Sequence, residues 1–183
     1  MEEYLDILDK HGNPLGESHP KSLVHQKGFY HNTVHIWFYT NEGEILLAQR
    51  SYKKSICPGL WDVSVAGHVD AGETIVEAAI REVSEEIGLT INHHNLKKIG
   101  IFECFQDYDF GISDNEFHHT FLCKLTSSLD SLKPHPEEVE SLKLITSEEF
   151  SNFIKHIGKD NHFVPSNKLY YLKIISAIQE QIS

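Results

Sequence analysis

Three glutamates lie close together in a segment with the pattern of a helix. Glu82, Glu85 and Glu86 are three and four residues apart, so on an α-helix they project from one arc of its surface. Like charges at this spacing repel, and the last turns of a helix already disfavour anions. A divalent cation such as Mg²⁺ would compensate them, because it takes carboxylate ligands and binds substrate phosphates. Taken alone, the triplet equally fits an exposed, solubilising helix face.

Capping signals and apolar spacing predict the helix that carries these carboxylates over residues 75–87. Thr74 and Glu77 form a capping box at its start, and Gly88 supplies its end. Four apolar residues at helical spacing are expected to face the core: Val76, Ile80, Val83 and Ile87.

Further helices are predicted over residues 148–156, where Thr146 and Glu149 repeat the capping relation, and over residues 167–182. The last helix is expected to present an apolar face made of Leu169, Leu172, Ile175 and Ile178. Strand patterns cover residues 34–40, 45–50, 61–66, 97–105 and 117–125, with a hairpin at 41–44 and a surface loop at 127–136. Strands interspersed with helices predict an α/β or α+β sandwich, and the length fits a single domain over residues 1–183.

The composition disfavours several classes of function. Sixteen Lys and Arg against 27 Asp and Glu give a net charge of −11, which repels nucleic acids and anionic membranes. The sequence has no export signal and no apolar run of membrane-spanning length. Its three cysteines follow no disulfide or zinc-ribbon pattern. We therefore expect a cytoplasmic protein that binds a small molecule, with neither a nucleic-acid nor a membrane partner.

The context of the glutamates makes their interpretation more specific. The segment GHVDAGETIVEAAIREVSEEIGL, residues 67–89, resembles the Nudix box, Gly-x5-Glu-x7-Arg-Glu-U-x-Glu-Glu-x-Gly-U with U aliphatic, at every fixed position. The resemblance implies an α/β/α sandwich with a central mixed sheet and hydrolysis of a nucleoside diphosphate linked to another group. It further implies Mg²⁺ or Mn²⁺ bound by the Gly67 carbonyl and by Glu82, Glu85 and Glu86.

Two more roles follow from the same resemblance. Glu73 and Arg81 would form an ion pair that fastens the loop to the helix. Glu85 or Glu116 would serve as the general base that activates water. A homodimer is expected by analogy alone.

Beyond the box, residues 4–180 resemble the branch of the family that contains isopentenyl-diphosphate isomerase. The matching residues are Lys21-x3-His25, His31, Arg50, Lys53-Lys54, Pro58-Gly59-x-Trp61, Ser64-Val65-x-Gly67-His68 and Asp114-x-Glu116. The resemblance implies a second divalent metal site, with Mn²⁺ or Zn²⁺ favoured by its imidazoles, made of His25, His31, His68, Asp114 and Glu116. Four cations are expected to contact the diphosphate: Lys21, Arg50, Lys53 and Lys54.

One departure from that branch changes the expected reaction. Ala66 stands where the isomerase has its catalytic cysteine, and a methyl group can neither donate nor accept a proton. Diphosphate hydrolysis is therefore the expected activity. Two alternatives stay open, namely an isomerase in which another residue replaces the thiol and a binding module without catalysis.

Seven other histidines are interpreted as surface or structural residues: His35, His93, His94, His119, His135, His156 and His162. His118 is left open, because strand alternation would place it on the same side as Glu116.

Overall fold

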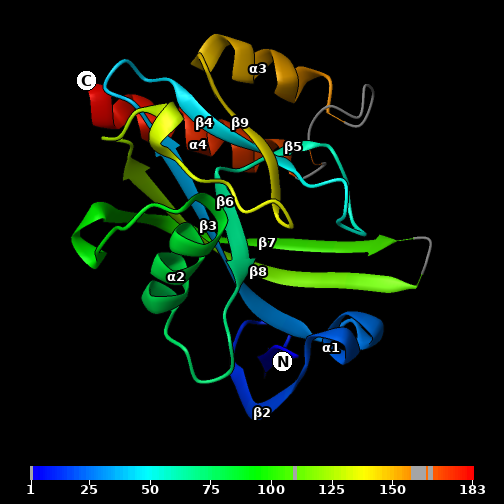
Figure 1. Cartoon of the computed structure of the whole chain (residues 1–183). Coiled ribbons are helices and arrows are strands. Elements are labelled where there is room, and N and C mark those ends of the chain that lie inside the picture. Colours follow the sequence, from blue (N-terminus) through cyan, green and yellow to red (C-terminus); the bar gives the residue numbers. More distant parts are fainter. Residues whose placement is uncertain (1, 109–110, 158–163, 165–166) are drawn as a thin grey trace.

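The computed structural model describes residues 2–108, 111–157, 164 and 167–183. Within these ranges the chain forms one nine-stranded sheet and four α-helices (Figure 1). The helices are α1 (Lys21–Lys27), α2 (Ile75–Ile87), α3 (Ser147–Lys155) and α4 (Lys168–Ile182). The strands are β1 (Tyr4–Leu8), β2 (Pro14–Pro20), β3 (Tyr30–Tyr39), β4 (Ile45–Arg50), β5 (Trp61–Asp62), β6 (Val65–His68), β7 (Leu96–Tyr108), β8 (Ile112–Lys124) and β9 (Val139–Ile145).

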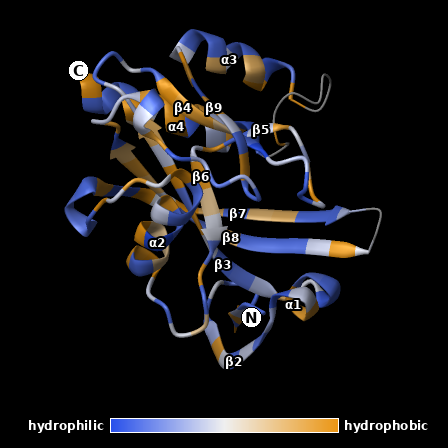
Figure 2. Ribbon diagram, viewed as in Figure 1, coloured by the Kyte–Doolittle hydropathy of each residue, from blue (hydrophilic) through white to orange (hydrophobic). Residues whose placement is uncertain are grey.

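Strand β3 lies at the centre of the sheet. It pairs in parallel with β8 along its whole length and antiparallel with β1, β4 and β6, so the sheet is mixed. Val34, Ile36 and Phe38 pack on one face with residues of α2, whereas Trp37 and Tyr39 pack on the other with α3 and α4. This period-two alternation buries both faces of the sheet (Figure 2) and confirms the predicted sandwich of helices around a mixed sheet.

Helix α2 has the predicted bounds and both predicted caps. The Thr74 hydroxyl accepts a hydrogen bond from the Glu77 backbone N–H, and Gly88 ends the helix in the left-handed conformation. Its predicted apolar face is partly wrong, because Val76 is exposed while Ala78 and Ala79 are buried against the sheet. Two small alanines let the helix approach the sheet closely, which rotates the buried face away from Val76.

The face predicted for α4 is also partly wrong. Leu169 and Leu172 are exposed, whereas Ile175 and Ile178 are buried as predicted. The inner face is completed by Tyr170 and by Tyr171, whose rings contact Trp37. The large aromatic rings bury more apolar area than the leucines, which decides the rotation of the helix.

The other predicted elements are present with altered bounds. The 45–50 strand matches β4, the 41–44 hairpin joins β3 to β4, and the 127–136 loop contains only a short 3₁₀ turn, η2 (Leu129–Ser131). The strand predicted over 61–66 is two strands, β5 and β6. Three strands and one α-helix were not predicted, namely β1, β2, β9 and α1.

Several of these elements line two neighbouring cavities. Helix α1, strands β3, β6 and β8 and helix α2 all contribute residues to them. Across the described ranges, no helix is both long and apolar enough to cross a membrane.

Candidate functional site

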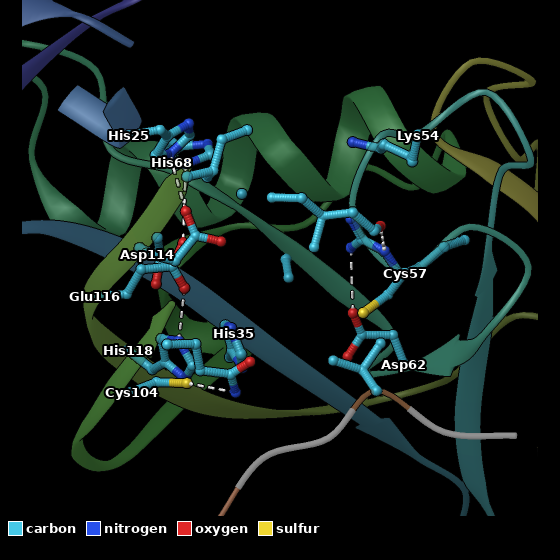
Figure 3. A pocket seen from close by; sticks show the side chains of 18 of the residues that line it. His25, His35, Lys54, Cys57, Asp62, His68, Cys104, Asp114, Glu116 and His118 are labelled. Atoms are coloured by element: carbon cyan, nitrogen blue, oxygen red, sulfur yellow. Dashed lines mark hydrogen bonds and ion pairs between the residues drawn. The ribbon is translucent and has the colours of Figure 1, made fainter. Parts of the chain in front are cut away.

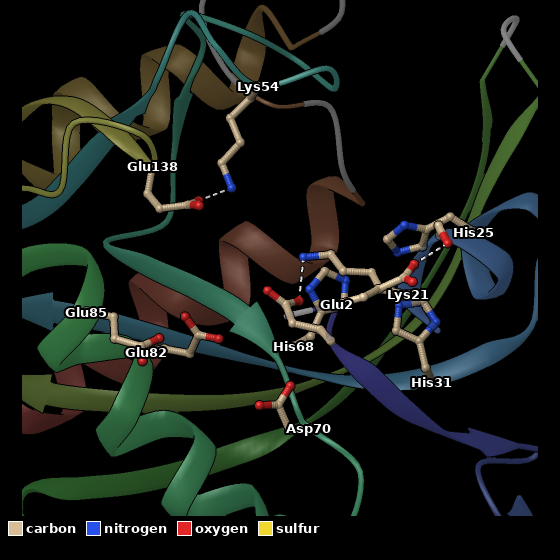
Figure 4. Close-up of polar contacts among 12 residues, drawn as sticks. Glu2, Lys21, His25, His31, Lys54, His68, Asp70, Glu82, Glu85 and Glu138 are labelled. Carbon is tan, nitrogen blue, oxygen red and sulfur yellow. Dashed lines mark hydrogen bonds and ion pairs between the residues drawn. The ribbon is translucent and has the colours of Figure 1, made fainter. Parts of the chain in front are cut away.

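The three glutamates of α2 line one side of a cavity of about 340 Å³. The Glu82 side chain is 13% exposed and Glu86 is 8% exposed, whereas the Glu85 side chain is 60% exposed. Figure 4 shows Glu82 and Glu85 on the side of α2 that faces Lys21 and His68. The predicted convergence of the three carboxylates is therefore present, with two of them turned inward.

Burial makes the two inner carboxylates difficult to ionise. It raises the pKa of Glu82 to about 7, against the opposing effect of Arg81. Burial, together with the charge of Glu82, raises the pKa of Glu86 well above its usual range. Within the described residues, the Glu86 carboxylate accepts one long hydrogen bond, of 3.4 Å, from the backbone N–H of Ala66. Both groups would be stabilised in their charged form by a bound cation.

Gly67 contacts the Glu82 carboxylate directly. A Cβ atom at residue 67 would overlap the Glu82 carboxyl group, so only glycine lets this side chain lie against β6. The Gly67 backbone also lines the same cavity. The glycine that the sequence pattern identified as a carbonyl ligand thus has a second, steric role.

Arg81 connects the loop before α2 to the carboxylates. Its guanidinium donates two hydrogen bonds to Glu73, of 2.9 and 2.8 Å, and a further one of 2.9 Å to the His68 carbonyl. The other terminal nitrogen donates to Glu82 at 2.7 Å and to Glu85 at 3.1 Å. One guanidinium therefore faces three carboxylates, and among the side chains that line the cavity carboxyl groups outnumber cations.

Three histidines from different elements meet beside this cavity. His25 lies on α1, His31 on β3 and His68 on β6, and their ring centroids form a triangle with sides of 5.2 to 5.3 Å. A ligand nitrogen from each lies within 4.8 Å of the other two.

Two carboxylates of β8 close the group. His25 Nε2 is 3.6 Å from Asp114 Oδ1, and Glu116 Oε1 lies 3.7 Å from His31 Nε2 and 3.9 Å from His68 Nε2. The structure thus brings together all five residues of the second metal site expected from the sequence.

Several donor atoms of this group are buried and face one another without hydrogen bonds in the described residues. The Nε2 atoms of all three histidines and Asp114 Oδ1 are buried and make no hydrogen bond within the described part of the chain. His31 Nδ1 lies 3.0 Å from the Phe29 carbonyl, which can only accept, so Nε2 keeps its lone pair. Burial lowers the pKa of His25 to about 4 and raises that of Asp114 to about 6.

The second cavity, of about 280 Å³, is lined by histidines and by carboxylates, among them His25, His68, Asp114 and Glu116 (Figure 3). It shares four residues with the cavity beside α2, and these are Lys21, Ala66, Gly67 and His68. The two hollows are therefore contiguous. Ala66 lies at their junction, so a methyl group stands between the carboxylates and the histidines.

The four predicted cations differ in position. Lys21, Arg50 and Lys54 line the second cavity. Lys21 pairs with Glu3 at 2.7 Å, Lys54 pairs with Glu138, and Arg50 pairs with Asp62 at 3.3 Å.

Lys53 is separate from these three. Its side chain is 61% exposed and pairs with Glu137 on the surface. Lys53 is therefore the weakest of the four for contact with a substrate.

Two histidines that sequence reasoning did not place in the site lie in the second cavity, namely His35, interpreted as a surface or structural residue, and His118, left open. His35 and His118 line it, and their rings stack with centroids 3.8 Å apart. The alternation of β8, which places Glu116 and His118 on one face, was the available signal. His119 faces the other way and bonds Asn32 at 2.9 Å, as expected for a structural residue. The prediction for His162 lies outside the described residues.

Comparisons with protein families and with known sequences identify related proteins. The NUDIX domain family matches residues 29–166. An uncharacterized Nudix hydrolase of Clostridium acetobutylicum is 33% identical over 98% of each chain. Isopentenyl-diphosphate Delta-isomerase 2 of Photorhabdus laumondii is 29% identical, covering 99% of this chain and 95% of that one. Nudix hydrolase 3 of Arabidopsis thaliana is 37% identical over 90% of this chain, which spans 22% of that protein's length.

Solved structures share the fold at low sequence identity. The Deinococcus radiodurans protein DR0079 has a TM-score of 0.70 at 20% identity, covering 94% of this chain and 98% of that one. The NUDIX domain of Shewanella oneidensis NrtR, complexed with ADP ribose, gives 0.57 at 14% identity, covering 83% and 88%. A bifunctional NMN adenylyltransferase/ADP ribose pyrophosphatase of Francisella tularensis gives 0.52 at 23% identity, covering 83% and 41%.

Proposed function

Because the chain belongs to the Nudix family, we propose that it is a divalent-metal-dependent hydrolase that cleaves the diphosphate linkage of a small nucleoside diphosphate conjugate. One observation carries this proposal. Glu86 is buried and Glu82 largely buried, with the Glu82 carboxyl group lying against Gly67 where a Cβ would overlap it, in a cavity where carboxylates outnumber cations. Burying anions in this way is costly unless a cation joins them.

The residues of α2 fit a hard divalent cation such as Mg²⁺ or Mn²⁺. Glu82, Glu85 and Glu86 offer carboxylate oxygens, and the Gly67 backbone lies beside them in the same cavity. These are the ligand types that Mg²⁺ prefers, with substrate phosphates and water completing its shell. When bound, such ions neutralise the diphosphate and lower the pKa of a bound water.

The histidine group fits a second cation of softer character. Three imidazole nitrogens and two carboxylates converge from four elements, and several of their donor atoms are buried without hydrogen bonds in the described residues. Mn²⁺ or Zn²⁺ suits this mixture of nitrogen and oxygen ligands better than Mg²⁺ does.

The remaining side chains have defined roles in this proposal. Glu73 holds Arg81 by two hydrogen bonds, and Arg81 fixes Glu82 and Glu85 in turn. Lys21 is placed to contact a diphosphate that spans both cavities, because it lines each of them.

The base that takes the proton of the attacking water is Glu85 or Glu116. Glu85, held by Arg81 at 3.1 Å, is the most exposed of the three carboxylates that face this cavity from α2 and is accessible to water, whereas Glu116 lies deeper, in the second cavity. Glu85→Gln and Glu116→Gln distinguish the two roles, since only loss of the base removes the acidic limb of the pH–rate profile, where the rate rises as the base loses its proton.

The substrate class follows from charge and space. Cations at the rim and proposed metal ions favour an anionic diphosphate, and a second cavity of about 280 Å³ adjoins the carboxylates to hold the attached group. The NrtR domain and the Francisella enzyme, which share the fold, are both described with ADP ribose. We therefore place ADP-ribose first among the compounds to test. We also propose the cytoplasm as the location, since the three cysteines are unpaired in the described structure.

A substrate panel with metal titration tests the proposal. ADP-ribose, other nucleoside diphosphate conjugates and prenyl diphosphates would be incubated with Mg²⁺ or Mn²⁺, and the phosphomonoester products followed by ³¹P NMR. Hydrolysis should require the metal, and Glu86→Gln should reduce it by about 10²-fold or more. Unchanged turnover in that variant contradicts the mechanism. Binding of a panel member without turnover would instead identify a non-catalytic module.

A further inference from the structure

A second group of potential metal ligands lies in the same cavity as the three histidines. His35 lies on β3, and Glu116 and His118 lie two residues apart on β8, the parallel neighbour of β3. Residues two apart on a strand share a face, so Glu116 and His118 both point toward His35. One ligand atom from each of the three residues lies within 4.8 Å of the others.

Glu116 belongs to both groups through different oxygens. Its Oε1 lies 3.7 Å from His31 Nε2, whereas its Oε2 lies 2.7 Å from His118 Nε2. Figure 3 shows Glu116 and Asp114 between His25 and His68 on one side and His35 and His118 on the other. A carboxylate placed in this way can bind one ion through each oxygen, the arrangement of two-metal hydrolytic sites.

Hydrogen bonds behind His35 orient its ring. The Tyr170 hydroxyl accepts the indole N–H of Trp37 at 2.9 Å, and His35 Nδ1 lies 2.9 Å from the same oxygen. With Nδ1 facing the Tyr170 hydroxyl, an ion would use the other ring nitrogen of His35, Nε2. Such outer contacts are typical of histidines that bind metals.

The chemistry of this second group specifies the kind of ion. Two imidazoles and one carboxylate are the donor set of catalytic zinc sites, which keep a position for water or substrate. Hard cations such as Mg²⁺ prefer oxygen ligands and would remain at α2. The group also lies inside the cavity, where an ion could be reached by a bound molecule.

We propose that His35, Glu116 and His118 form a further binding site for a divalent cation of the Zn²⁺ or Co²⁺ type, joined through Glu116 to the three-histidine site. The inference rests on the proposed function in one respect, because Glu116 also belongs to the three-histidine metal site proposed there. Without a metal, the same residues would form a hydrogen-bonded pair of His118 and Glu116 beside a neutral His35, and the experiment distinguishes these two states.

Cobalt titration of the full chain tests the site without measuring activity. Excess Mg²⁺ would occupy the α2 carboxylates, and Co²⁺ binding would be followed by calorimetry and by its visible absorption. The double variant His35→Gln with His118→Gln should bind one equivalent of Co²⁺ fewer than the wild type. Tyr170→Phe, which removes only the hydroxyl behind His35, should weaken this equivalent by about 10- to 100-fold.

Two control variants separate the sites. His119→Gln changes a buried histidine of β8 that faces Asn32, and it should retain all the Co²⁺ bound by the wild type. His31→Gln with His68→Gln should lose the equivalent held by the three-histidine site and retain the other. Circular dichroism and thermal unfolding would establish that each variant is folded before its binding is interpreted.

The outcomes distinguish the inference from the proposed function. Loss of Co²⁺ only in the His31 and His68 variant overturns the inference and leaves the three-histidine site in place. Loss only in the His35 and His118 variant supports the inference and contradicts the three-histidine site. No Co²⁺ bound by the wild type contradicts both. With Mn²⁺, spin coupling between two ions in the electron paramagnetic resonance spectrum should report the shared Glu116, and two uncoupled ions would refute the bridge.

Discussion

Replacement of Glu82 by glutamine should stabilise the metal-free protein and at the same time abolish its activity. Glu82 is largely buried, and burial raises its pKa from 4.5 to about 7. A group whose folded pKa is raised stabilises the fold below its unfolded pKa, and this contribution is lost as the pH rises through the folded pKa. At pH 8 in EDTA the ionised Glu82 therefore destabilises the wild type, whereas glutamine carries no charge.

The size of this effect follows from the pKa. A change from 4.5 to about 7 corresponds to about 3 kcal/mol, at about 1.4 kcal/mol per pKa unit. This value already includes the opposing effect of Arg81 on the Glu82 carboxylate. A gain of ~3 kcal/mol should raise the Tm by about 6–12 °C in a chain of this length.

Thermal unfolding in EDTA between pH 5 and pH 8 measures the effect. The gap between Glu82→Gln and the wild type should be present at pH 8 and small at pH 5. Glu85→Gln is the matched control, and its Tm should stay near that of the wild type because its side chain is 60% exposed. Added Mn²⁺ should stabilise the wild type more than Glu82→Gln. A lower Tm for Glu82→Gln at pH 8, or a gap independent of pH, would refute the reasoning.

Three further predictions concern the surroundings of the carboxylates. Gly67→Ala should displace Glu82 and reduce kcat/KM by about 10²-fold, and an unaltered rate would show that the close contact is not needed. Glu73→Gln should weaken its hold on Arg81, lowering the free energy of unfolding by about 2 kcal/mol in urea titrations, and an unchanged midpoint would contradict this. Isopentenyl diphosphate should remain unisomerised in ¹H NMR, because Ala66 has no proton to transfer, and formation of dimethylallyl diphosphate would contradict this.

The parts of the fold that sequence reasoning predicted well have strong local signals. The bounds of α2 follow from a capping box and a terminal glycine, and the structure has both. Strand β4 is a short apolar run, and its predicted bounds are unchanged. In such segments the local preference and the tertiary packing favour the same conformation.

The strands around the site were predicted too short for a functional reason. β3 begins at Tyr30 and β8 at Ile112, each several residues before the apolar runs that predicted them. The missing parts contain His31 and Glu116, polar residues that break the pattern of a buried strand. Site residues are where local rules are expected to fail.

The second ligand group could not be found from spacing alone. His35 and His118 lie far apart in the sequence, and only the parallel pairing of β3 with β8 brings them together. That pairing is a long-range property of the sheet. The first histidine group was found only because its residues resemble those of the isomerase branch.

The measurement that tests the central claim most directly is anomalous diffraction from crystals soaked in Mn²⁺ with a non-hydrolysable ADP-ribose analogue. The account predicts manganese peaks against Glu82, Glu85 and Glu86, in contact with the diphosphate of the analogue. A diphosphate bound in the cavity with no manganese beside these three side chains would contradict it.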